Sequence, residues 1–136
     1  MNVDELVKTH PGPADALRGG SAQRNEPVVI SHCQTIDRTL VIALRGVIDE
    51  TSVYPVRLML AVAVKSGYVR LVVDCEEVTD CGKELLDLLL SWKRNGRNLV
   101  LASPSSPVRR QIAAEIAMHL FLCALSVRHA LDLVER

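Results

Sequence analysis

The side chains best suited to covalent chemistry lie in one short polar stretch near the middle of the chain. It runs from Cys75 to Gly82 and holds a hydroxyl at Thr79 and a second thiol at Cys81. An apolar run precedes it and a segment with a helical apolar stripe follows it, so we expect a loop that joins a strand to a helix N-terminus. A helix N-terminus stabilises anions. A phosphate on the hydroxyl, or an oxidised thiol, would therefore be stabilised in this loop.

Cys81 is the first candidate for a reactive group. A cysteine near a helix N-terminus tends to have a lowered pKa, and oxidation to a sulfinic acid would place an anion there. The simpler interpretation is a small, partly buried side chain. Cys33 and Cys123 occur in apolar segments and are expected in the core. The 4 cysteines form no CxxC pair and no disulfide framework, which predicts reduced thiols and a cytoplasmic protein.

Residue patterns for catalysis or metal binding are weak. The carboxylates of Asp49, Glu50 and Asp74 resemble acid–base groups, but such residues more often cap helices and end strands. His119 and Cys123 have the helical spacing of metal ligands, but we expect the chain to leave the helix between them. The sequence contains no glycine-rich phosphate loop, nucleophile elbow or catalytic triad. It therefore predicts a protein that is not an enzyme and needs neither metal nor cofactor.

Composition limits the class of partner. The chain has 136 residues with 16 basic and 16 acidic side chains, a formal net charge of zero and 3% aromatic residues. Nucleic-acid-binding proteins normally show a basic excess and often aromatic stacking platforms. The N-terminus does not resemble a secretory signal, and no apolar run reaches the roughly 18 residues of a membrane span. We expect a protein that binds neither nucleic acid nor a membrane.

Hydrophobic periodicity predicts alternating strands and helices around the polar stretch. Residues 1–26 are punctuated by proline and glycine and predict a flexible tail, with one marginal helical turn at Val3, Leu6 and Val7. Residues 27–136 are the expected domain. Its expected strands are Val28–Ile30, Leu40–Leu44, Val69–Asp74, Leu99–Ala102 and Leu120–Leu125.

Turn and cap residues indicate where the helices begin and end. Asp37 and Arg38 predict a hairpin turn, and a helix capped by Thr51 or Ser52 is expected to end at Gly67. The inward residues expected on the later helices are Leu85, Leu88, Leu89 and Trp92, then Val108, Ile112 and Ile116, and finally Val127, Ala130, Leu131 and Val134.

This order predicts an α/β fold with a mixed, mostly parallel sheet of four to five strands and about four helices. The first long helix is unusual, because residues 58–64 are apolar almost all round. Such a helix is either buried on two sides or offers an apolar face to a partner, a second copy of the chain included.

From about residue 28 to the C-terminus, the sequence resembles the STAS domain, a family that includes bacterial anti-sigma factor antagonists. The resemblance rests on the order and spacing of LVIALRGVID at 40–49, VVD at 72–74, NGRNLVL at 95–101, SPVRR at 106–110 and the Ala130-Leu131 pair. It implies a STAS-like fold and a bacterial regulator that acts by partner switching.

The motif that carries the phospho-switch in STAS antagonists is altered here. In that family the loop ends in Asp-Ser-Ser-Gly, and its first serine is phosphorylated by the partner, an anti-sigma factor that is also a kinase. The matching stretch is Asp80-Cys81-Gly82-Lys83, so Cys81 stands at the phosphorylation position and Thr79 is a substitute candidate. Counting from Asp74 instead places Lys83 at that position. Either alignment removes the serine.

The resemblance therefore implies an anti-sigma factor antagonist that binds an anti-sigma factor of kinase fold, regulates sigma-factor-dependent transcription and lacks the usual switch. Two alternatives stay open: a thiol-based redox sensor on the STAS scaffold, with Cys81 as the reactive group, and a structural STAS subunit of a larger signalling or transport assembly. The implied partner-binding residues are Asp49, Glu50, Thr51, Ser52, Thr79, Asp80, Cys81, Gly82 and Lys83.

Overall fold

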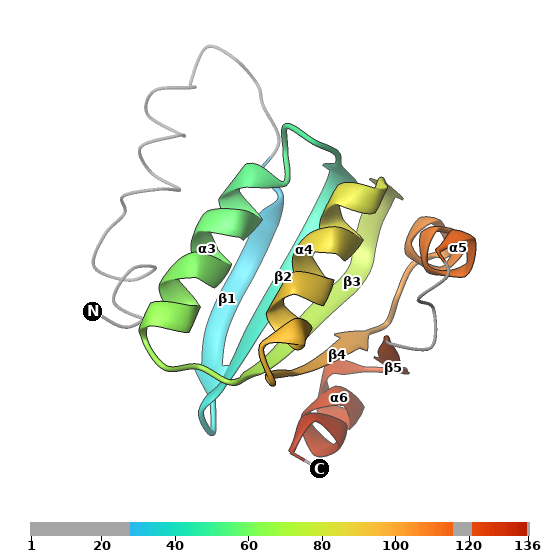
Figure 1. Cartoon of the computed structure of the whole chain (residues 1–136). Coiled ribbons are helices and arrows are strands. Elements are labelled where there is room, and N and C mark those ends of the chain that lie inside the picture. The colour runs from blue at the N-terminus through green and yellow to red at the C-terminus, as the bar shows by residue number, and fades with distance from the viewer. Residues whose placement is uncertain (1–27, 116–120, 136) are drawn as a thin grey trace.

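The computed structural model describes residues 28–115 and 121–135, which form a five-stranded mixed sheet with helices on both faces (Figure 1). The predicted order of strands and helices is confirmed. No helix in these two ranges is long and apolar enough to cross a membrane. The elements are β1 (Ile30–Ile36), β2 (Thr39–Ile48), α3 (Tyr54–Lys65), β3 (Arg70–Cys81), α4 (Lys83–Arg94), β4 (Asn98–Ala102), α5 (Ser106–Ala114), β5 (Leu122–Ala124) and α6 (Val127–Val134).

The sheet is parallel except at one edge. Its strands lie in the order β1-β2-β3-β4-β5, with β1 antiparallel to β2 and all other neighbours parallel. The predicted hairpin turn is confirmed, with φ of 48° at Asp37 and 68° at Arg38. Positive φ at both positions is typical of the tight turns that match the twist of paired strands. Parallel pairing brings the carboxyl ends of β2, β3 and β4 toward one edge, where α/β folds place their binding sites.

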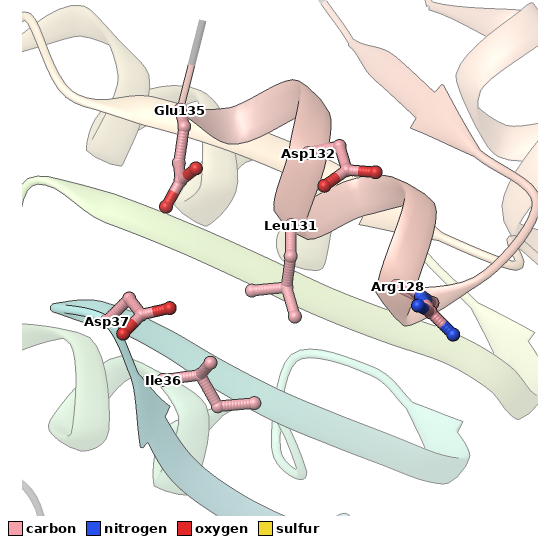
Figure 2. A pocket seen from close by; sticks show the side chains of 6 residues that line it. All are labelled: Ile36, Asp37, Arg128, Leu131, Asp132 and Glu135. Carbon is pink, nitrogen blue, oxygen red and sulfur yellow. The ribbon is translucent and has the colours of Figure 1, made fainter.

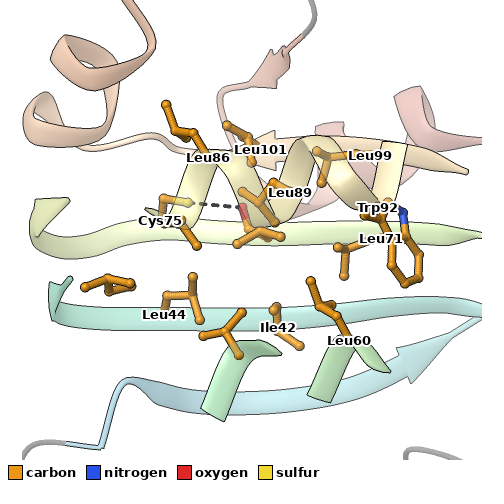
Figure 3. Packing of buried hydrophobic residues seen from close by; sticks show 14 of the residues in the cluster. Ile42, Leu44, Leu60, Leu71, Cys75, Leu86, Leu89, Trp92, Leu99 and Leu101 are labelled. Carbon is orange, nitrogen blue, oxygen red and sulfur yellow. Dashed lines mark hydrogen bonds between the residues drawn. The ribbon is translucent and has the colours of Figure 1, made fainter. Parts of the chain in front are cut away.

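Helices α3 and α4 lie side by side over one face of the sheet, and α6 packs on the other face (Figure 1). The larger apolar core lies beneath α3 and α4, and part of it is drawn in Figure 3. Trp92 sits near the end of α4, where its indole N–H donates a hydrogen bond to the Asn98 carbonyl at 2.9 Å. The smaller cluster on the other face comprises Val41, Val72, Val100, Ala102, Ala124, Ala130 and Val134.

Helix α4 largely follows its predicted inner stripe. Leu85, Leu89 and Trp92 are buried as predicted, whereas Leu88 is only half-buried. Leu86 and Leu90 are buried as well, because α4 contacts more than the sheet beneath it. This wide apolar face packs α4 firmly on the core and so fixes the start of the helix over the sheet.

The predicted loop from residue 75 to 82 is wrong, because the chain continues there as a strand. We expected the strand to end at Asp74, but β3 runs on to Cys81 and stays paired with β2 to that end, with two register shifts on the way. β4 pairs with β3 only as far as Asp74, so the rest of β3 has β2 as its single strand neighbour. Polar residues such as Glu77 can therefore face solvent while Val78 points into the core. The acidic residues that suggested a loop are the exposed residues of this strand extension.

Other strand boundaries also shift. The first strand is not Val28–Ile30 but begins at Ile30 and continues to Ile36. β2 extends the predicted Leu40–Leu44 strand to Ile48, with register shifts in its pairing to β3. The last strand is confirmed as a three-residue element inside the predicted 120–125 segment.

The predicted side-chain caps of α3 are wrong. Its N-cap is Val53, without a capping hydrogen bond from a side chain, rather than Thr51 or Ser52. Pro55 lies in its first turn, where a missing N–H is harmless. Gly67 follows the end of α3 with φ of 88°, a left-handed conformation that glycine adopts without strain.

The two short C-terminal helices are confirmed where the structure describes them. Val108 and Ile112 of α5 are buried, while Ile116 and His119 lie outside the described residues. In α6, Ala130 and Val134 are buried, and the two partly buried residues of the predicted stripe pack beside them; these are Val127 and Leu131.

The two serine N-caps provide a matched test. Ser126 accepts a hydrogen bond from the His129 N–H at 3.1 Å, whereas Ser105 caps α5 without such a bond. We expect Ser126→Ala to lower the free energy of unfolding by about 1 kcal/mol. Ser105→Ala should cost less, since its buried hydroxyl has no hydrogen-bond partner. Urea denaturation of both variants measures the difference, and equal losses would contradict the assignment of the α6 cap.

Candidate functional site

Two segments that are distant in the sequence meet at one edge of the sheet, between the N-termini of α3 and α4 (Figure 1). Val47 lies opposite Asp80 in the ladder, and Ile48 lies opposite Cys81. The Gly82 N–H then donates a hydrogen bond to the Ile48 carbonyl at 3.2 Å. Residues 47–52 and 79–84 therefore form one continuous surface, which we call the β2–β3 edge. It contains all the residues predicted to bind a partner.

The turn on the β2 side is held by its own polar groups. The Asp49 carboxylate accepts hydrogen bonds from the backbone N–H groups of Thr51 and Ser52, each at 2.9 Å. The Ser52 hydroxyl donates to the Val47 carbonyl at 2.7 Å and accepts from the Asp49 N–H at 2.9 Å. Hydrogen bonds from Ser52 and Thr51 lower the pKa of Asp49. Asp49 and Ser52 thus fix the turn and leave Glu50 and Thr51 exposed.

On the β3 side, the side chains divide between solvent and core. Thr79 and Asp80 are exposed, whereas Cys81 is only 6% exposed. The Asp80 carboxylate accepts a hydrogen bond from the Cys81 N–H at 2.9 Å, which steadies the end of the strand. Across from it, Val47 is 44% exposed, a surface residue that our sequence reasoning missed. Alternation along the strand could have found it, because Val47 directly precedes the buried Ile48.

Helix α4 begins at this edge with Gly82 as its N-cap and Lys83 as its first residue. The residue at the helix N-terminus is therefore Lys83, which is exposed, and not Cys81. The Glu84 carboxylate folds back into the space that a Cβ on Gly82 would occupy, so glycine allows this close approach. Thr79 lies within β3 rather than in the first turn of the helix. The edge thus carries one lysine among the carboxylates of Asp49, Glu50, Asp80 and Glu84.

The expectation of a reactive thiol at Cys81 is not supported. Burial raises the pKa of Cys81 to about 11, with smaller contributions from the negative charges of Asp80 and Glu84. Its Sγ–H donates to the Gly82 carbonyl at 3.3 Å. Cys81 does lie near a helix N-terminus, as expected, because it directly precedes the Gly82 N-cap, but its side chain ends β3 and is buried in the core. Cys75 is fully buried and its pKa is raised as well.

The core placement expected for the other two cysteines is wrong in part. Cys33 is only partly buried, although it packs against the larger core, and Cys123 is exposed. Cys123 lies on β5, where it faces Leu101 of β4 in the ladder. β5 is an edge strand with only β4 as a strand neighbour. A residue such as Cys123 can therefore reach solvent although its neighbours in the sequence are apolar.

Thiol alkylation tests this arrangement. We expect Cys123 to react first and Cys81 at least about tenfold more slowly than a model thiol at pH 8, because a raised pKa lowers the thiolate fraction. Brief iodoacetamide treatment followed by peptide mass mapping measures each site, with the urea-unfolded chain as the control in which all sites react. Reaction of Cys81 as fast as Cys123 would contradict its burial.

The carboxylates considered for acid–base chemistry are not brought together. Asp74 lies opposite Ala43 of β2, while Asp49 follows the end of that strand, about 20 Å further along at roughly 3.3 Å per residue. Asp74 accepts a hydrogen bond from the Glu76 N–H at 3.1 Å. In the described ranges, no group of three or more histidine, cysteine, aspartate or glutamate residues is placed to hold a metal ion.

Two hollows lie away from the β2–β3 edge. One, between the β1–β2 turn and α6, has Leu131 extending from the helix toward the sheet (Figure 2). The other lies beside β3 and is lined by Ser31, Ala43, Leu44, Asp74, Glu76 and Glu77. Neither hollow contains a residue predicted to bind a partner. The first is lined by Ile36, Asp37, Arg128, Leu131, Asp132 and Glu135.

Comparison with known proteins assigns the family. A family model described as "Mlab, STAS domain" matches residues 31–119. The chain belongs to the STAS domain family. The predicted family and fold are therefore confirmed.

Solved structures with this STAS fold include anti-sigma factor antagonists. One from Mycobacterium paratuberculosis is 19% identical with a TM-score of 0.71, covering 82% of this chain and 98% of its own. SpoIIAA in its unphosphorylated form is 20% identical with a TM-score of 0.65, covering 76% and 95%. The phosphorylated form of Bacillus SpoIIAA is 18% identical with a TM-score of 0.61, covering 76% and 97%. At these identities the likeness establishes the fold. Among curated proteins, none matches the chain.

Proposed function

We propose that this STAS domain is an anti-sigma factor antagonist that binds an anti-sigma factor of kinase fold through the β2–β3 edge. The observation that carries the proposal is the pairing of Ile48 with Cys81, which joins residues 49–52 and 79–83 into one largely exposed surface at the start of α4. Solved STAS structures named as anti-sigma factor antagonists support it. Through this binding, the domain would regulate sigma-factor-dependent transcription.

The proposed antagonist works without the usual serine switch. Lys83 occupies the first helical position and carries an amine rather than a hydroxyl. Cys81 is buried, and Thr79 lies on β3, before the helix N-terminus that would stabilise a phosphate. A kinase partner would find no hydroxyl at the start of α4, so ATP should leave the complex intact.

Charge at the edge indicates the chemistry of the partner surface. The β2–β3 edge carries four carboxylates, those of Asp49, Glu50, Asp80 and Glu84, and the single cation of Lys83. A surface of this sign favours a partner that presents basic side chains, because complementary potentials steer association and suppress wrong partners. The exposed Val47 adds an apolar contact beside these charges.

Co-elution with candidate anti-sigma factor kinases from the same organism tests the proposal. The full chain is mixed with each kinase, with and without ATP, and followed by size-exclusion chromatography and intact mass. We expect a complex that survives ATP with the mass of the chain unchanged. A gain of one phosphate together with loss of the complex would overturn the switchless mechanism. No complex with any such kinase would overturn the proposed function.

A further inference from the structure

Helix α3 presents an apolar stripe to solvent. Its inner face is buried through Val56, Met59, Leu60 and Ala63, but the opposite face is open. Tyr54 is 58% exposed, Leu58 42% and Val64 38%, and Ala61 between them is also exposed. The spacing of these four residues places them on one side of the helix. Such a stripe is typical of a surface that another element covers.

Two cations border this stripe, and their charges are not balanced locally. Arg57 and Lys65 are both exposed, and α3 contains no acidic residue. Among the residues that the structure describes, no carboxylate forms an ion pair with either side chain. The outer face of α3 therefore fits a short segment that combines apolar and acidic residues.

The N-terminal tail contains such a segment. In Val3-Asp4-Glu5-Leu6-Val7, three apolar residues recur at the spacing of one helical turn, and two adjacent carboxylates lie between them. One helical turn is marginal alone in water and needs a surface to pack against. We propose that residues 3–7 dock on the outer face of α3, with the apolar residues on the stripe and the carboxylates beside Arg57 and Lys65.

The tail joins the domain near α3 and is long enough for residues 3–7 to reach the outer face of this helix. Val29 packs into the core beneath α3 and α4, and its carbonyl accepts a hydrogen bond from the Arg45 N–H at 2.8 Å, so Val28 lies near the end of β2 that leads into α3. Residues 8–27 span about 25 Å as a flexible chain, while α3 with its 12 residues is about 18 Å long. A tether of this length holds the segment at an effective concentration in the millimolar range.

Docking of the tail would regulate access of a partner to the surface beside the β2–β3 edge. Tyr54, the first residue of α3, follows directly on the turn that Asp49 and Ser52 hold. A tail seated on the stripe covers the neighbouring surface and competes with any partner that extends from the edge onto α3. The docking itself depends on residues 3–7 and α3 alone, and does not require the proposed partner.

Carbodiimide cross-linking of the full chain tests the docking. This reagent joins a carboxylate and an amine that are in contact, so we expect an amide between Asp4 or Glu5 and Lys65, located by peptide mass mapping. Leu6→Gln removes an apolar contact and should lower the yield about tenfold. Leu17→Gln, in the same tail but outside the segment, should leave the yield unchanged. Circular dichroism confirms that both variants stay folded.

Cross-linking at several protein concentrations distinguishes docking of the tail from coverage of the stripe by a second copy of the chain. A cross-link within one chain has a yield that does not change with protein concentration, and this result supports the proposal. A cross-link between two chains, with a yield that falls on dilution, would mean that a second copy covers the stripe and would overturn it. Absence of the Lys65 cross-link while other lysines react would overturn it as well.

Discussion

Leu89→Ala is expected to lower the free energy of unfolding by about 2–5 kcal/mol, the largest stability effect that we predict. Leu89 is fully buried on the inner face of α4 and belongs to the same apolar cluster as Leu71 and Leu101 (Figure 3). Protein cores are close-packed, so truncation removes favourable contacts and leaves a cavity that neighbouring side chains fill only in part. Urea denaturation followed by circular dichroism measures the loss as a lower midpoint at an unchanged slope.

The matched control is Leu125→Ala, the same chemical change at a side chain that is 83% exposed. This variant should stay within about 0.5 kcal/mol of the parent chain, since little apolar surface is removed from the interior. Equal losses in the two variants would contradict the packing of α4 on the sheet. A changed denaturation slope for Leu89→Ala would instead indicate a less compact native state.

The fold was largely predictable because its signals are local and repeat along the chain. The stripe of α4 follows from side-chain periodicity, and the turn at Asp37 and Arg38 follows from the turn preference of these residues. The extension of β3 to Cys81 was not predictable in this way. It depends on pairing with β2, a contact between distant segments that the acidic residues conceal locally.

The proximity of the candidate site residues was predictable, but the surroundings of each side chain were not. The resemblance placed residues 49–52 and 79–83 together, and the β2–β3 ladder brings them into contact. The predicted environment of Cys81 was wrong, because β3 continues past Asp74 to Cys81 and the alternation of side chains along it turns Cys81 into the core. The exposed Val47 was missed for the same reason.

Lys83→Glu is expected to weaken binding of the proposed anti-sigma factor partner by at least about tenfold while leaving the fold intact. The resemblance implies that STAS antagonists bind the partner only when unphosphorylated. Glutamate at position 83 places a negative charge close to the position at which that phosphate is expected. The edge already carries the carboxylates of Asp49, Glu50, Asp80 and Glu84, so the variant removes its single cation. The four carboxylates still attract basic side chains of the partner, so the expected loss comes from the negative charge placed at the start of α4 itself, where a phosphate would act in the same way.

Measurements of stability distinguish a loss of partner binding from unfolding of the variant. A glutamate in the first turn of α4 interacts favourably with the helix dipole, so Lys83→Glu should unfold at the same or a higher urea concentration than the parent chain. Lys93→Glu makes the same change in net charge in the last turn of α4. It should lower stability, because a carboxylate there opposes the dipole, and leave binding unchanged, because it lies at the far end of the helix from the β2–β3 edge. Titration of each variant against the kinase by calorimetry gives the ratio of dissociation constants. Equal affinities for the parent and Lys83→Glu would mean that the start of α4 does not contact the partner.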